Sequence, residues 1–160
     1  MEEHLRSSKR HSEDKILTKT MINNYAKNDL LPPPVKKKYS KEHMLILVFI
    51  YYFKNILSIS DIQKLLEPIT QKYFPGEGSI DLTALYEEIM KLELEQIDPL
   101  AKDVTRKFSM ANDSFPNVSE EEKDFLHKFA FICMLSFDVY VKKQVIENLI
   151  DQMSREEKTE

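Results

Sequence analysis

Hydrophobic and polar residues alternate along the chain with the period of a helix, and the first periodic segment is residues 18–28. Thr18 can cap this helix, and Tyr25 belongs to its apolar face. The prolines at 32–34 cannot continue a helix and hold the chain extended. The pattern therefore predicts a short polar helix followed by an extended, lysine-rich segment at residues 34–39.

Later helices are predicted wherever apolar residues recur at i, i+3 and i+4 after a polar cap. They cover approximately residues 41–55, 60–74, 82–97, 99–110 and 120–153, with Ser60 at the start of the second of them. The clearest break in this series is Pro75–Ser79. We therefore predict a mainly α protein with a polar N-terminal segment (1–17), a head (18–75) and a C-terminal helical bundle (80–157).

The composition argues against most enzyme classes. The only glycines, Gly76 and Gly78, both lie in this break, so neither a phosphate-binding loop nor a dinucleotide fingerprint is possible. The four histidines never fall at metal-ligand spacing, and a single cysteine, Cys133, excludes internal disulfides and thiolate zinc sites. We expect no catalytic residue, no cofactor and no metal site, and a protein that is not an enzyme.

Two residues of the last predicted helix receive a structural explanation. Cys133 lies in the apolar run FAFICML at 129–135, which is typical of an inert core thiol rather than of a reactive thiolate. Asp138 has apolar neighbours, and we expect it to pair with Lys142 one helical turn later. Neither is predicted to form a site.

Charge is distributed unevenly along the chain. Residues 15–43 hold seven lysines against two acidic residues, a net charge of +5, whereas the remaining 131 residues carry a net charge of −9. A local positive field on an acidic protein suits an anionic partner. A solvated lysine-rich turn is the alternative.

No segment predicts a membrane span. The most apolar run, MLILVFIYYF at 44–53, is about half the ~20 residues that a spanning helix needs. The polar opening of the chain has no apolar core of a signal peptide. With one cysteine and no such segments, we expect a cytoplasmic protein.

The order of elements between Thr18 and Leu66 follows a known pattern. The matching positions are Tyr25, Leu30, Leu31, Pro32, Pro33, Tyr39, Ser40, Ile50 and Ile62. This stretch resembles the winged-helix head of the MerR-like transcriptional regulators, in which a recognition helix precedes a Leu-Leu-Pro-Pro-like turn and a basic wing. The resemblance implies a winged helix-turn-helix (MerR-like) head that binds DNA.

A second resemblance rests on the hexamer TMINNY at 20–25, with KKYS at 37–40 and Ser58-Ile59 downstream. These strings are similar to the bacterial family called domain of unknown function 1836. That family has no assigned biochemistry, so the resemblance implies a fold rather than an activity.

The chain departs from the MerR-like pattern at two points. Asn23 stands where that pattern commonly has an arginine, and the wing at Val35–Tyr39 is shorter.

The predicted head carries side chains suited to DNA. Lys19, Asn23 and Lys27 are spaced i, i+4 and i+8, so they lie along one helical stripe. An asparagine amide matches the edge of adenine, and lysines neutralise phosphates. The predicted DNA-binding residues are Lys19, Thr20, Asn23, Asn24, Lys27, Lys36, Lys37, Lys38 and Tyr39. Two alternatives remain open: the asparagine amides brace the helix end, and Tyr39 packs beneath the wing.

The C-terminal unit is acidic, so we expect it to face away from nucleic acid. Its last helix has more aromatic side chains than a small bundle buries, which predicts a homodimer through these helices or a ligand pocket among them. The leading hypothesis is a DNA-binding transcriptional regulator. The alternative is a non-enzymatic helical module that binds a protein or a small ligand.

Overall fold

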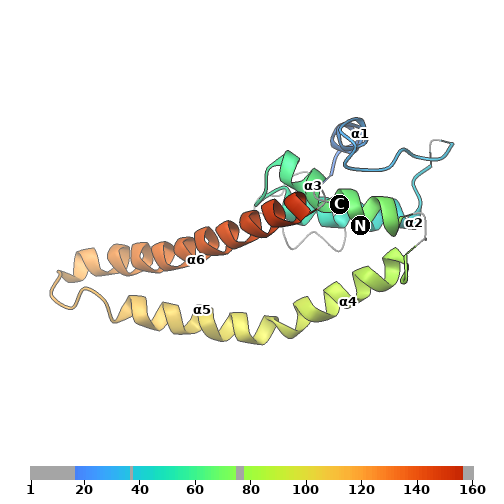
Figure 1. Cartoon of the computed structure of the whole chain (residues 1–160). Coiled ribbons are helices and arrows are strands. Elements are labelled where there is room, and N and C mark those ends of the chain that lie inside the picture. Colours follow the sequence, from blue (N-terminus) through green and yellow to red (C-terminus); the bar gives the residue numbers. More distant parts are fainter. Residues whose placement is uncertain (1–16, 37, 75–77, 157–160) are drawn as a thin grey trace. The chain divides into compact units, whose positions relative to one another are not determined.

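The computed structural model describes residues 17–36, 38–74 and 78–156, and these are mainly α-helical, as the sequence predicts. The chain divides into two compact units between Tyr86 and Glu87, inside a helix rather than at the expected break. The first unit contains α1 (Lys19–Lys27), α2 (Lys41–Phe53), α3 (Ile59–Lys72) and the start of α4 (Leu82–Glu95) (Figure 1). The second contains the rest of α4, α5 (Ile97–Asn112) and α6 (Glu120–Glu156).

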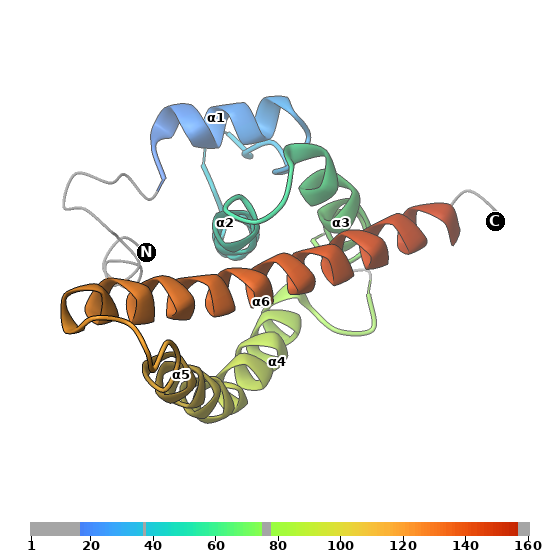
Figure 2. The ribbon, with the colours of Figure 1, turned by 90° about the vertical axis from the view of Figure 1, so that its left-hand side faces the viewer.

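Helix α2 supplies the centre of the first unit's core. Its Ile46 and Ile50 are fully buried, and Figure 2 shows α2 nearly end-on with α1 and α3 beside it. Buried apolar residues from the surrounding elements complete the core: Tyr25, Leu30, Leu31, Leu57, Ile62, Leu66 and Leu82. The apolar run at 44–53 therefore lies at the centre of this core, although Met44 and Tyr52 reach solvent.

Local sequence explains where α3 begins. Ser58, rather than the expected Ser60, is the N-cap: its Oγ accepts a hydrogen bond from the backbone N–H of Asp61 at 3.2 Å. The helix therefore starts at Ile59, two residues after the buried Leu57.

The second unit is a helical hairpin with few buried residues. Phe108 of α5 meets Phe131 of α6 edge to face, with ring centroids 5.5 Å apart. His127 Nε2 lies 3.0 Å from the carbonyl oxygen of Ser114, which joins α6 to the loop between the two helices. Among the described residues of this unit, only Lys107, Ala111 and Ile150 are buried.

Two expectations for α6 are wrong. Cys133 is exposed, because it does not lie on the side of α6 that carries Phe131 and Asp138. Asp138 pairs with Lys107 of α5 and not with Lys142, because the packing of α5 on α6 brings a cation within reach across the hairpin. Within the described ranges, no helix has both the length and the apolar character needed to cross a membrane.

Candidate functional site

Helix α1 presents a continuous polar surface to solvent. The exposed side chains on this surface, named here the α1 stripe, are Lys19, Thr20, Asn23, Asn24 and Lys27. Asn28 closes the end of the helix, since its Nδ2 donates a hydrogen bond to the backbone oxygen of Asn24 at 2.8 Å. No hydrogen bond within the described residues occupies the side-chain amides of Asn23 and Asn24, so both amides face solvent.

The opposite face of α1 attaches it to the core. Tyr25 is 7% exposed, and this burial raises the pKa of its phenol. Asp29 takes a left-handed conformation (φ 55°), and the backbone N–H of Leu30 donates a hydrogen bond to the backbone oxygen of Tyr25 at 2.9 Å. This is a Schellman-type helix ending. Leu30 and Leu31 then enter the core, each 1% exposed. The stripe is therefore held on a rigid support.

The predicted wing is a tight turn rather than the expected extended segment. The backbone N–H of Lys38 donates to the Val35 oxygen at 2.9 Å, and these two residues form an isolated bridge. Lys36 has a φ of 49°, the left-handed conformation found at this position in primed turns. Lys36 and Lys38 are exposed, while Lys37 lies outside the described residues. Residues 35–38 are named here the basic turn.

A buried histidine holds the base of the basic turn. The Nδ1 of His43 accepts a hydrogen bond from the backbone N–H of Ser40 at 3.0 Å, and its Nε2 lies 3.4 Å from the Pro33 oxygen. The rings of Tyr39 and Phe74 meet the imidazole edge to face, with centroids 5.3 and 4.7 Å away. These contacts connect Pro33 and Ser40, which lie before and after the basic turn, to α2. His43 itself is only 2% exposed.

Sequence reasoning missed this role of His43. The signal was present in Ser40 followed by a polar side chain three residues later, which is the spacing of a capping box. The structure also clarifies Tyr39, which packs against His43 yet stays 37% exposed. One acidic group accompanies these residues: a hydrogen bond from the Ser40 hydroxyl lowers the pKa of Glu42.

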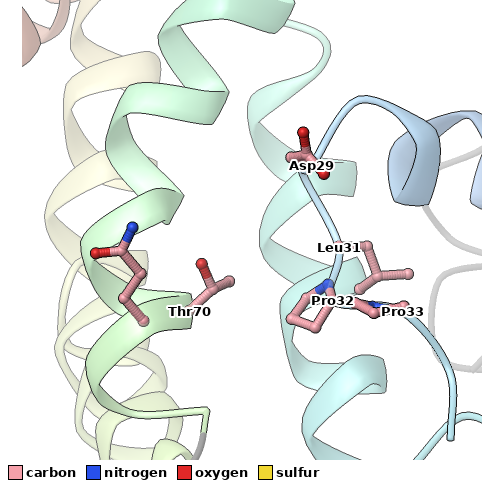
Figure 3. A pocket seen from close by; sticks show the side chains of 6 residues that line it. Asp29, Leu31, Pro32, Pro33 and Thr70 are labelled. Carbon is pink, nitrogen blue, oxygen red and sulfur yellow. The ribbon is translucent and has the colours of Figure 1, made fainter.

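A small hollow separates the loop after α1 from the end of α3. Its walls are Asp29, Leu31, Pro32, Pro33, Thr70 and Gln71, and its volume is about 170 Å³ (Figure 3). Pockets that bind drug-sized molecules measure roughly 300–1,000 Å³. Within the described residues, no group of three or more His, Cys, Asp or Glu side chains could hold a metal ion.

The structure places the predicted site residues in two groups on one unit. Five form the α1 stripe, and Lys36, Lys38 and Tyr39 lie in or beside the basic turn. The buried segment Leu30–Leu31 and the prolines join the two groups (Figure 1). The first unit therefore carries an exposed surface of cations and amides with little competing acid.

Comparisons with known proteins concern this same unit. The model of a family described as "Domain of unknown function (DUF1836)" matches residues 1–89. No curated protein and no solved structure is significantly similar to the chain. The matched segment includes α1, the basic turn, α2, α3 and the start of α4, and therefore every residue of the candidate surface.

Proposed function

The chain belongs to the family of domains described as DUF1836, and we propose that it is a non-enzymatic, DNA-binding transcriptional regulator. The reading element is α1, and the basic turn holds the adjacent phosphates. In this proposal, residues 18–75 form a head similar to the MerR-like winged helix, with the basic turn in the place of the wing.

The observation that carries the proposal is the two-sided character of α1. Its buried face is fixed by Tyr25 and the Schellman-type ending, while the α1 stripe faces solvent along the whole helix. A helix that enters the major groove needs this combination, because base readout requires polar side chains on a rigid support. Asn23 supplies a donor and an acceptor on one side chain, as adenine recognition requires.

Electrostatics support the same function. Lys19 and Lys27 lie on the α1 stripe, and Lys36 and Lys38 are exposed in the basic turn. Each cation that meets a phosphate releases a counterion from DNA, so affinity depends steeply on salt. Since residues 15–43 carry a net charge of +5, the head attracts DNA in spite of the acidic remainder of the chain.

The second unit completes the proposal as a homodimerisation element. Large apolar side chains of α6 are extensively exposed, including Phe125 at 68% and Phe129 at 53%. Such a surface is typical of an interface rather than of a monomer. Two copies would present two heads, which is how small DNA-binding heads gain specificity.

One form of the alternative function also has an observation in its favour. A helical module that binds another protein would use the same exposed side chains of α6. The hollow beside Asp29 has only about 170 Å³, so it does not favour a drug-sized ligand at that place. The two functions differ in the part of the chain that meets the partner, so DNA titration separates them.

The test is fluorescence anisotropy of a labelled mixed-sequence duplex, titrated with the protein at several salt concentrations. We expect binding that weakens steeply with salt. The variant Lys36/Lys37/Lys38→Ala should lower the slope of log K against log[salt] by about 3 if each lysine neutralises one phosphate.

A matched control removes the same charge elsewhere. Lys91/Lys102/Lys128→Ala changes three exposed lysines of the second unit and should leave affinity and salt slope within about twofold of the wild type. Absence of binding at low salt, or an equal effect of both triple variants, would contradict the proposal.

A further inference from the structure

Within the part of the chain that the structure describes, the second unit leaves one face of α6 without a partner. Among the residues of α6 that meet α5 or its loop are His127, Phe131 and Asp138. With about 100° of rotation per residue, side chains two positions before or after these point to the opposite side of the helix. That side carries Phe125, Phe129 and Ser136, and Ile132 and Val139 border it; these five residues are named here the outer seam.

The outer seam has the spacing of a coiled coil. Its members are separated by four, three, four and three residues, which are the alternating a and d positions of a heptad. The exposed fractions are 68% for Phe125, 53% for Phe129, 59% for Ile132 and 62% for Val139. A heptad seam is complementary to another helix, because knobs from each helix enter holes on the other.

We propose that the outer seam pairs in antiparallel fashion with the outer seam of a second copy of this chain. The pairing sets Phe125 opposite Ser136 of the second copy and Phe129 opposite Ile132 of the second copy. Each bulky ring then meets a smaller side chain, and the two-fold axis repeats every contact. This inference rests on the homodimer of the proposed function and not on DNA binding.

Charges at the two ends of the seam favour this orientation. Glu121 and Lys142 are both exposed and flank the seam at its opposite ends. The antiparallel pairing brings each Glu121 beside Lys142 of the second copy, and this ion pair occurs twice. A parallel pairing would instead set Lys143, the next seam position after Val139, against itself.

The same charges select the register. Moving the antiparallel pair by one heptad would put Phe125 opposite Lys143 and Lys128 beside Lys142. The exposed part of the seam extends about 21 Å along the helix, from Phe125 to Val139. Ile150, which continues the heptad spacing, is only 3% exposed, so the available seam ends before it.

The first experiment is sedimentation equilibrium of the full chain without DNA. We expect a wild-type dimer, and we expect Phe125→Glu to raise the dissociation constant at least about tenfold, since a charge then faces an apolar seam. Phe137→Glu is the matched control: Phe137 is 66% exposed on the same helix but lies off the seam. Its dissociation constant should stay within about twofold of the wild type. Circular dichroism checks that each variant keeps its helix content.

The second experiment tests orientation with substitutions that leave the core intact. Glu121→Lys and Lys142→Glu should each raise the dissociation constant, roughly threefold to tenfold, because each creates two pairs of like charges. The double variant should return to within about twofold of the wild type, because it restores both pairs with the charges exchanged.

Each result decides the proposal. A wild-type monomer, with α6 covered within its own chain or by another protein, would overturn both the seam and the homodimer. A wild-type dimer that Phe137→Glu dissociates as strongly as Phe125→Glu, or in which the double charge variant is no tighter than either single variant, would overturn the seam alone. Failure to bind DNA would leave the seam untouched.

Discussion

Lys107 of α5 and Asp138 of α6, 31 residues apart in the chain, form an ion pair across the helical hairpin. Lys107 is 8% exposed and also pairs with Asp103 of its own helix, whose carboxylate additionally binds Arg106 at 2.7 Å. The hydrogen bond to Asp103, followed by that to Asp138, raises the pKa of Lys107. The hydrogen bond from Lys107, followed by that from Arg106, lowers the pKa of Asp103. A buried lysine that bridges two helices fixes the register of α5 on α6.

Replacing Lys107 with methionine should reduce thermal stability at neutral pH, because it leaves the Asp138 carboxylate without its partner. The raised pKa of Lys107 means that its contribution is present below the ordinary lysine value and is lost as pH rises through the folded value. The lowered pKa of Asp103 means that its contribution is present above the ordinary aspartate value and is lost as pH falls.

Melting temperatures of wild type and Lys107→Met, measured across pH, test this assignment. Their difference should be largest at neutral pH and should shrink in strong acid and strong base. A difference that does not vary with pH would show that Lys107 acts through packing alone.

Thr18→Ala should destabilise α1. The Thr18 hydroxyl accepts a hydrogen bond from the Met21 N–H at 3.1 Å, and loss of such a cap costs about 1 kcal/mol. Thr20→Ala is the control for stability, since Thr20 is exposed within the helix. Chemical denaturation followed by circular dichroism measures both. Equal effects would argue against Thr18 as the cap.

Ile46→Ala should lower the free energy of unfolding of the first unit more than a substitution at its surface. Ile46 is fully buried in α2, and truncation of such a side chain costs roughly 2–5 kcal/mol. The comparison is Ile59→Ala, where the side chain is 48% exposed and the cost should stay below about 1 kcal/mol. Urea denaturation of the two variants gives both values. Similar losses would mean that α2 is not the centre of the core.

Asn23→Ala and Lys27→Ala should separate base reading from phosphate binding. Loss of the Asn23 amide should reduce the preference for a selected site over mixed DNA by about 1–3 kcal/mol, with little change in salt dependence. Loss of Lys27 should weaken both duplexes alike and lower the salt slope by about 1. Competition titrations at several salt concentrations distinguish the two. If both variants behave alike, α1 does not read bases in the proposed way.

Local chemistry made much of the fold predictable. Thr18 caps α1, three prolines follow it, and the acidic residues at 120–122 open α6, so the starts of these helices were expected from short-range rules. The start of α3 was displaced from Ser60 to Ser58, because Ser58 stands three residues before Asp61, whose backbone N–H donates to the Ser58 hydroxyl. The exposure of the α1 stripe followed from Ile22, Tyr25 and Ala26, because their helical spacing marks the opposite, apolar face of α1.

By itself, the sequence determined the helices, the caps and the concentration of lysine before α2, since these depend on residues within a few positions of one another. Only the tertiary structure decided that His43 supports the basic turn, that Lys107 forms an ion pair with Asp138, and that Cys133 faces solvent. The physical reason is the same for all three. Which side of an apolar helix is covered depends on the element that packs against it, and several faces of α2 and α6 were apolar enough to be chosen.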